Sequence, residues 1–152
     1  VVDDNYDAFC DVPTCKRKYR DCFMFQYADV KNWFDDQIKA VFGIDIFDYP
    51  FDKEKGWSII RKGNISIFCY RLDKLSSLEN EIGEFAGVKD FSLKRDNSAA
   101  DKAYYYAYKA YLEEVKIKKE FFEQLMQSEA VSYFYTEEEC ENMRRKWEKR
   151  FW

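Results

Sequence analysis

The sequence predicts an α/β fold that is mostly helical, with about five helices packed on a small sheet. Glycine and proline together number only seven in 152 residues, which disfavours a turn-rich sandwich or barrel. Apolar residues recur at helical spacing along most of the chain, whereas residues 57–72 have the pattern of two strands and a turn. The 30 aromatic residues cannot all stay in water, so we expect a folded chain with a real core.

The first predicted helix follows Asp29, a residue type that caps helix N-termini. Apolar side chains recur at helical spacing over residues 30–42, and Gly43 follows as a C-cap. Residues 44–51 are predicted to be extended, because the residue before Pro50 avoids the helical region. The chain therefore enters its strands from a helix and an extended, aromatic-rich segment.

Two strands are predicted next, at residues 57–61 and 65–72, after a charged turn at residues 52–56. Lys62-Gly63-Asn64 between them gives a tight turn, since glycine takes positive φ freely. The second run, ISIFCYRL, is nearly continuous in apolar residues, which suits an interior strand covered on both faces. We expect the predicted helices to cover this hairpin, because a two-stranded hairpin is not stable alone.

Four further helices are predicted after the hairpin, with a short extended piece around Phe91 and Leu93. No internal repeat or low-complexity linker is visible, so we expect one domain over residues 1–152, with residues 1–28 as an N-terminal segment. The helical signals are a capping box of Ser76 and Glu79 with Gly87 as the end, helical spacing from Ser98 to Val115 and from Phe121 to Met126, and a second capping box of Thr136 and Glu139.

Missing residue types exclude several kinds of chemistry. The chain has no histidine, which excludes Ser-His and Cys-His nucleophile pairs, zinc ligand sets that include His, and the usual general base near pH 7. No glycine spacing makes a phosphate-binding loop. The net charge of −4 argues against nucleic acid as a partner, and no apolar run approaches the roughly 18 residues that a membrane span needs.

The five cysteines fit neither a disulfide framework nor a metal site. Their number is odd, and Cys10, Cys15 and Cys22 lack the CxxC spacing of zinc sites. We expect Cys69 and Cys140 to be buried free thiols. No signal peptide is visible, so the sequence favours a cytoplasmic protein with reduced cysteines and no metal.

Four features could bind a ligand, and each also has a simpler structural interpretation. The tyrosines of residues 104–111 could stack on sugars or bases, but a helix with surface tyrosines is the favoured explanation. Residues 61–64 could bind an anion at a turn, or form a solvated hairpin turn. Arg71 could face a site at the strand's end, or pair with a carboxylate such as Asp73. The basic run within residues 144–150 is most simply the solvated face of the last helix.

Three pieces of the sequence carry a resemblance. The first is GIDIFDYPFDKEKGW at residues 43–57, and the second is the apolar strand followed by residues 71–75 and EIGEFAGV. The third comprises Asn97 with Lys102 and Tyr104, then FYTEEE and Lys146-Trp147. Together they resemble a bacterial family of capsular polysaccharide synthesis proteins that are sulfotransferase-like, and residues 29–150 are similar to its C-terminal portion.

The resemblance implies a P-loop-type α/β fold, of which this chain is the C-terminal portion or a shortened relative. It also implies transfer of a sulfuryl group from an adenosine phosphosulfate donor to the hydroxyl of a carbohydrate acceptor. The family's phosphate-sulfate loop lies in a half that this chain does not contain, so we expect no activity from the chain alone. The chain also departs from the family pattern, with Ala103 where the family has Trp and Asp73 where Glu is usual.

The binding residues predicted on this basis are Arg61, Lys62, Asn97, Lys102 and Tyr104. A competing hypothesis is a small non-catalytic binding module on the same fold. A third is a self-associating protein, a homo-oligomer, because an apolar strand without neighbours would need covering.

Overall fold

The computed structural model describes residues 30–94, 98–102 and 105–151. The predicted fold class is confirmed: the described residues are mostly helical, with one small two-stranded antiparallel sheet. The predicted N-terminal segment and its cap at Asp29 lie outside the described residues. The α-helices are α3 (Val30–Phe34), α4 (Ala40–Phe42), α5 (Glu79–Ala86), α6 (Tyr105–Glu114), α7 (Lys119–Met126), α8 (Glu129–Phe134) and α9 (Glu137–Trp147); a π-helix, η3 (Asp35–Lys39), joins α3 to α4; the 3-10 helices are η4 (Ile46–Asp48), η5 (Leu72–Ser77), η6 (Ala99–Asp101) and η7 (Glu148–Arg150); the strands are β1 (Trp57–Lys62) and β2 (Ile65–Tyr70).

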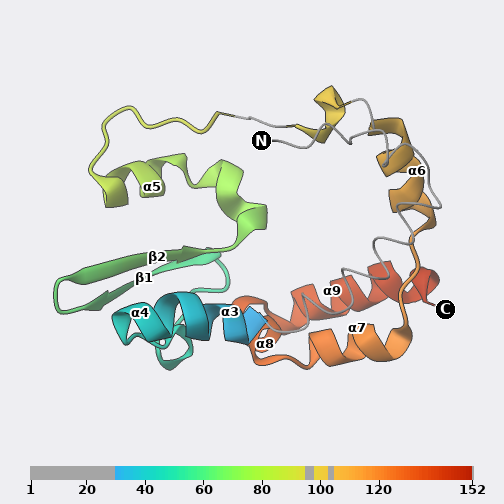
Figure 1. Ribbon diagram of the computed structural model, residues 1–152, viewed down its shortest axis with the longest axis horizontal. Helices are drawn as coiled ribbons and strands as arrows, with labels where there is room; N and C mark the ends of the chain where they lie inside the picture. The colour runs from blue at the N-terminus through green and yellow to red at the C-terminus, as the bar shows by residue number, and fades with distance from the viewer. Residues whose placement is uncertain (1–29, 95–97, 103–104, 152) are drawn as a thin grey trace, which may run out of the picture.

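The elements follow an open arc (Figure 1). The hairpin and α5 lie at one end, α7, α8 and α9 form the base, and η6 and α6 stand at the other end. Among the described residues, every helix is too short or too polar to cross a lipid bilayer.

The hairpin turns through two residues, Gly63 and Asn64, and pairs Trp57 with Tyr70 at its open end. Gly63 has a φ of +60°, the left-handed conformation that such a turn requires. Lys62 therefore belongs to the first strand rather than to the turn. The second strand stops at Tyr70 instead of Leu72, because the chain bends into η5 immediately after Arg71.

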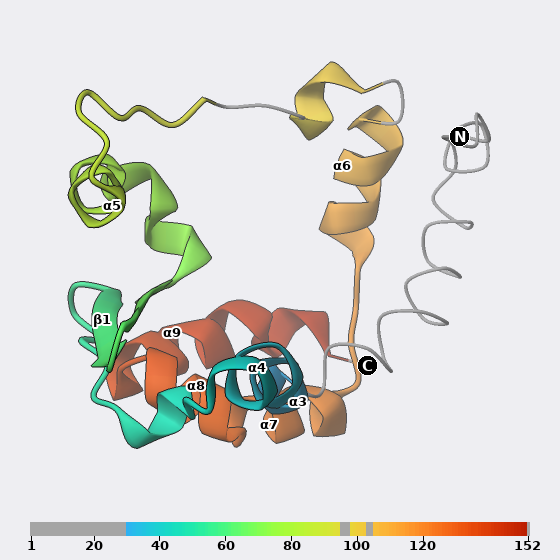
Figure 2. The ribbon, with the colours of Figure 1, turned by 60° about the vertical axis from the view of Figure 1, so that its left-hand side comes forward.

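Helices cover both faces of the hairpin, as the apolar run of β2 predicted (Figures 1 and 2). On one face Ile60 and Cys69 are buried with Ile44 and Ile46, and the side chains of α3 and η3 pack against them. On the other face Phe68 stacks on Trp57 with ring centroids 5.3 Å apart and contacts Phe85 of α5 at 5.3 Å. Phe68 is half-buried, because a two-stranded sheet gives each helix only a narrow surface to cover.

The predicted first helix is confirmed, and it ends at Gly43 with a φ of +63°. The segment after it is not wholly extended as predicted, because Asp45 starts the short 3-10 helix η4. The Asp45 carboxylate accepts a hydrogen bond from the Phe47 amide at 3.1 Å, which is a capping interaction. Tyr49 is extended before Pro50, as predicted, with a φ of −113° and a ψ of 149°.

One of the two predicted capping boxes is wrong. Ser76 lies inside η5, so it cannot take the extended conformation of an N-cap, and the N-cap of α5 is Leu78. The Glu79 carboxylate instead accepts a hydrogen bond from the Leu93 amide at 2.9 Å. The box of Thr136 and Glu139 is formed in full at the start of α9.

A second core lies at the other end of the molecule. Ile117, Phe122 and Met126 are buried there, and Met143 and Trp147 of α9 pack against them. The predicted apolar face of the last helix is therefore confirmed. A parallel bridge between Ile117 and Phe151 closes this core, with the Ile117 amide donating to the carbonyl of Arg150 at 3.0 Å.

The two cysteines in the described residues are free thiols. Cys69 is buried, as predicted, and desolvation raises the pKa of its thiol to about 11. Cys140 is half-buried on α9. Cys10, Cys15 and Cys22 lie outside the described residues.

Candidate functional site

The most densely bonded side chain is that of Arg71, which is only 6% exposed. Its Nη1 and Nη2 donate to the two carboxylate oxygens of Glu139 at 2.7 and 2.8 Å. Its Nε and Nη2 donate to Asp73 at 3.1 and 2.7 Å, and Nη1 also donates to the carbonyl of Phe134 at 3.3 Å. A guanidinium has five N–H groups, so every donor of Arg71 is used within the protein. The simpler interpretation of Arg71, pairing with carboxylates, is confirmed.

This arginine cluster, made of Arg71, Asp73 and Glu139, joins the end of β2 to the start of α9. The hydrogen bonds from Arg71 lower the pKa of both carboxyl groups, and the two carboxylates in turn raise the pKa of the guanidinium. The Tyr135 ring lies 4.3 Å from the guanidinium carbon, which adds a cation–π contact. Glu139 also accepts from the Thr136 amide at 3.0 Å, so one carboxylate serves both the helix cap and the cluster.

The chain also has a surface cleft of about 380 Å³, and one of its lining residues, Tyr133, directly precedes Phe134, whose carbonyl accepts from Arg71. The segment that follows α4 forms one wall, and α8 forms the other. We call it the aromatic cleft, and its lining residues are Phe47, Tyr49, Pro50, Phe51, Lys53, Glu129, Ser132 and Tyr133.

Tyr133 fixes the two walls of the aromatic cleft to each other. Its hydroxyl donates to the carbonyl of Ile46 at 2.7 Å, and the carbonyl of Tyr49 lies at 3.0 Å. Its ring contacts Phe47 and Phe51 with centroid distances of 5.0 and 5.5 Å. Burial raises the pKa of the Tyr133 hydroxyl to about 12, so the hydroxyl stays a neutral donor at physiological pH. The segment after α4 that forms the first wall is therefore held against α8 even without a ligand.

The side chains of the aromatic cleft suit a sugar. Aromatic faces pack against the C–H groups of a pyranose ring, while polar groups at the edge bond its hydroxyls. Lys53, Glu129 and Ser132 supply an ammonium, a carboxylate and a hydroxyl around the rings. Across the described residues, no group of three or more Cys, Asp or Glu side chains is placed to hold a metal ion.

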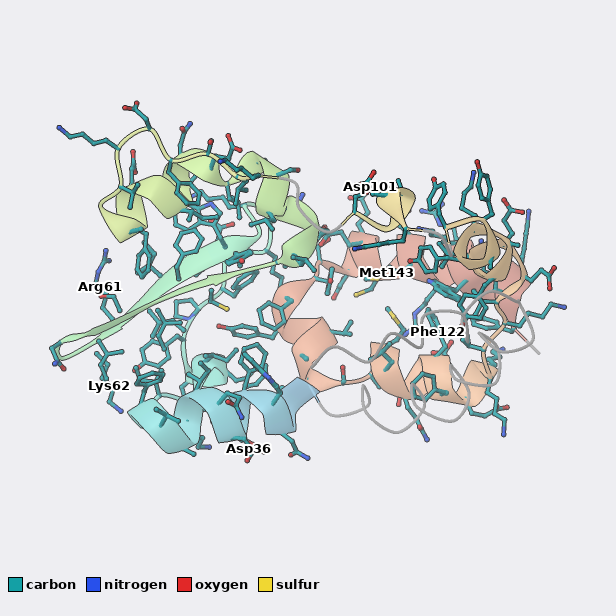
Figure 3. The ribbon with its side chains drawn as sticks, turned by 45° about the horizontal axis from the view of Figure 1, so that its top comes forward. Asp36, Arg61, Lys62, Asp101, Phe122 and Met143 are labelled. Carbon is teal, nitrogen blue, oxygen red and sulfur yellow. The ribbon has the colours of Figure 1, made fainter. Side chains whose placement is uncertain are left out.

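The residues predicted from the sequence lie elsewhere. Arg61 and Lys62 are exposed at the end of the hairpin, and their side chains leave it on opposite sides (Figure 3). The Lys62 ammonium donates to the carbonyl of Gly43 at 2.6 Å. Lys102 follows Asp101, which lies across the molecule from the hairpin tip (Figure 3), so the structure does not bring Lys102 to Arg61. Asn97 and Tyr104 lie outside the described residues.

The tyrosines of α6 lie on different faces of the helix, one buried and the other exposed to solvent. Tyr111 is buried with 8% exposure, whereas Tyr106 is 84% exposed. The rings of Tyr105 and Tyr106 lie 5.9 Å apart. This is the helix with surface tyrosines that the spacing favoured.

Some of the segments that carry the sequence resemblance lie at these two sites. Residues 43–57 form one wall of the aromatic cleft, and residues 71–75 and 134–139 supply the arginine cluster. A family model described as "Putative capsular polysaccharide synthesis protein" matches residues 18–136, well over half of the chain. The chain belongs to this family. No curated protein and no solved structure matched the chain.

In this family member, the aromatic cleft was missed by sequence reasoning. The helix α8 that forms one wall was not predicted, although Ser128 was a signal for it: its side chain accepts from the Val131 amide at 3.3 Å as an N-cap. The long-range hydrogen bond from Tyr133 to Ile46 has no signature in the sequence. A cleft built from such tertiary contacts is visible only in the folded chain.

Proposed function

We propose that this chain binds a saccharide in the aromatic cleft, as the acceptor-binding part of a protein that acts in capsular polysaccharide synthesis. The observation that carries the proposal is the cleft itself, in which four aromatic rings and a proline meet three polar side chains in about 380 Å³. A volume of this size accommodates one or two sugar rings of an oligosaccharide. Family membership supplies the class of ligand.

The reaction that we propose for this acceptor is sulfuryl transfer from an adenosine phosphosulfate donor to a sugar hydroxyl, in the cytoplasm. The support is the resemblance of the strand, turn and helix around Arg71 to the second half of sulfotransferases. No glycine spacing in the sequence makes a phosphate loop, so the proposal gives this chain acceptor binding and not donor binding. The alternative, a binding module without chemistry, uses the same cleft.

The predicted contacts Arg61, Lys62, Asn97, Lys102 and Tyr104 remain part of the proposal. Arg61 and Lys62 are both exposed at the hairpin tip, and the Lys62 ammonium, which donates to the Gly43 carbonyl, keeps further N–H groups for an anionic group. The aromatic cleft takes the sugar ring in this arrangement, and the hairpin contacts a charged substituent of the acceptor.

The test fills the cleft without disturbing its framework. Ser132 is an exposed cleft residue on α8, so Ser132→Trp places a large ring in the sugar's space. Ser92→Trp, at an exposed position outside the cleft, is the matched control. Binding is measured on an array of bacterial capsular oligosaccharides, with thermal unfolding as the check on folding.

We expect the unaltered chain to bind a subset of the glycans, and Ser132→Trp to weaken that binding by about tenfold or more. Ser92→Trp should bind as the unaltered chain does. Equal binding by both variants, or no glycan binding by a folded unaltered chain, would contradict the proposal.

A further inference from the structure

A set of basic residues lies on two segments that meet just before the start of α7. The parallel bridge between Ile117 and Phe151 lays residues 116–119, which read KIKK, beside the end of α9 and η7. Both ribbon views show this junction (Figures 1 and 2). We call this set the basic edge, and its members are Lys116, Lys119, Lys146, Lys149 and Arg150.

The four lysines of the basic edge are exposed and have no partner in the described part of the chain. None of them forms an ion pair within 4.0 Å with a described carboxylate. The nearest acidic residues in sequence are Glu113, Glu114, Glu120, Glu123 and Glu148, of which Glu123 is paired with Arg144. Arg150 donates to the carbonyl of Leu112 at 2.6 Å and lies over the Trp147 ring.

Stability explains only part of this arrangement. Lys149 and Arg150 lie at the negative end of the α9 dipole, which favours cations. Lys119, by contrast, is the first residue of α7, where the dipole disfavours a cation. Lys116 is next to Arg150 in the register of the bridge, and like charges in such positions repel. A bound anion would remove both penalties.

We propose that the basic edge binds an acidic polysaccharide, through the carboxylate or sulfate groups along its chain. This inference rests on the proposed function, because the capsular family supplies the saccharide. The whole chain carries a net charge of −4, whereas the basic edge presents four exposed lysines that form no ion pair with a described carboxylate. A long polyanion is repelled elsewhere and is held at this edge, and the net acidity disfavours nucleic acid as the occupant.

The experiment reverses two charges at the edge and two elsewhere. The test variant is Lys116→Glu with Lys149→Glu, and the control is Lys89→Glu with Lys94→Glu, at two exposed lysines outside the edge. Both variants change the net charge equally. The probes are polygalacturonate, dextran as its neutral counterpart, a DNA duplex, and vesicles with anionic lipid, all at low salt.

We expect the test variant to lose about tenfold or more of the affinity for polygalacturonate, and the control less than about twofold. The binding should weaken with added salt, because exposed charges are screened. Equal losses in the two variants would show an effect of net charge alone and overturn the inference. Edge-dependent binding to DNA or vesicles without binding to polygalacturonate would also overturn it.

The outcome can be separated from that of the proposed function. Ser132→Trp alters the aromatic cleft and leaves the basic edge intact. If the cleft proposal fails and the edge inference holds, polygalacturonate binding depends on the lysines and is unchanged by Ser132→Trp. If only the edge inference fails, glycan binding depends on Ser132 and is unchanged by the charge reversals.

Discussion

The two ends of this molecule are held together in different ways. Around the hairpin, polar side chains join segments that are far apart in sequence, as Arg71 joins Glu139 and Tyr133 joins Ile46. Each end has an apolar core, but the core around Phe122 is built from segments that are nearer in sequence, and a polar connection within it is the ion pair of Arg144 with Glu123. The polar connections around the hairpin also position the aromatic cleft, whereas the core around Phe122 does not touch it. Changes at the first end should therefore affect both stability and binding in the aromatic cleft, whereas changes in the second apolar core should affect stability and leave binding in the cleft unaltered.

The largest effect is expected from Phe122→Ala. Phe122 is 4% exposed and contacts the Trp147 and Phe151 rings, so its loss leaves a cavity in the second core. We expect unfolding to become easier by about 3–5 kcal/mol, measured in urea. Glycan binding in the aromatic cleft by the chain that remains folded should be unchanged, because Phe122 does not line the cleft. Weaker glycan binding by Phe122→Ala, at the same fraction of folded protein, would contradict the claim that the second core does not affect the aromatic cleft.

Arg71→Ala should cost about 3 kcal/mol, because two carboxylates and a carbonyl lose the hydrogen bonds from the guanidinium. Asp73 is about half exposed and recovers water, which keeps the loss at the lower end of the range. Arg61→Ala, at an exposed position, is the control and should stay within about 0.5 kcal/mol. Urea denaturation measures both, and equal values for the two variants would contradict the role of the arginine cluster.

Tyr133→Phe removes one hydroxyl and keeps the ring packing of the aromatic cleft. The lost bond to the Ile46 carbonyl should cost about 1–2 kcal/mol. Because this bond fixes the cleft wall, glycan binding should weaken as well. Tyr106→Phe on the exposed face of α6 should change neither quantity. A Tyr133→Phe protein with unchanged thermal stability would show that the two walls are held in another way.

The two predicted capping boxes, of which only one is formed, allow a matched pair of substitutions with smaller effects on stability. Thr136→Ala removes a formed N-cap and should cost about 1 kcal/mol. Ser76→Ala should cost less than about 0.5 kcal/mol, because Ser76 caps no helix. Calorimetric melting of both variants measures the difference. Similar losses would mean that Ser76 does cap a helix in solution.

The smallest expected effect is a dependence of stability on pH. The folded pKa values of Asp73 and Glu139 lie below their ordinary values of 3.8 and 4.5. Groups of this kind stabilise the fold above those values and lose that contribution as the pH falls through the folded pKa values. We expect less than about 1 kcal/mol, because both carboxylates are partly exposed. The acid-dependent loss should be smaller in Arg71→Met than in the unaltered chain, as followed by urea unfolding from pH 6 to about pH 3.

Local signals were enough to predict most of the helices and the hairpin. Helical spacing and a left-handed glycine located the end of the first helix at Gly43, and Gly63 located the turn. Local sequence signals failed where the neighbouring elements decide whether a residue stands at the start of a helix. Ser76-x-x-Glu79 and Thr136-x-x-Glu139 are equivalent as sequences, yet only the second stands at a helix start. Ser76 lies before the helix start because η5 occupies residues 72–77, so that α5 begins only at Glu79.

The candidate site was less accessible to sequence reasoning than the fold. Arg71 was singled out correctly as a strand-end cation, but its second partner is 68 residues away, a distance at which no local pattern operates. Lys53 and Ser132 attracted no attention because each is an ordinary surface residue alone. They become a site only when Tyr133 fixes the loop against α8.

The most direct test is an NMR titration, in which a capsular oligosaccharide that binds is added to isotope-labelled protein and the changes in amide chemical shift are recorded. The account predicts shifts that cluster at residues 47–53 and 129–133, on the two walls of the aromatic cleft. Shifts confined to the hairpin tip at Arg61 and Lys62, with the cleft unperturbed, would contradict it.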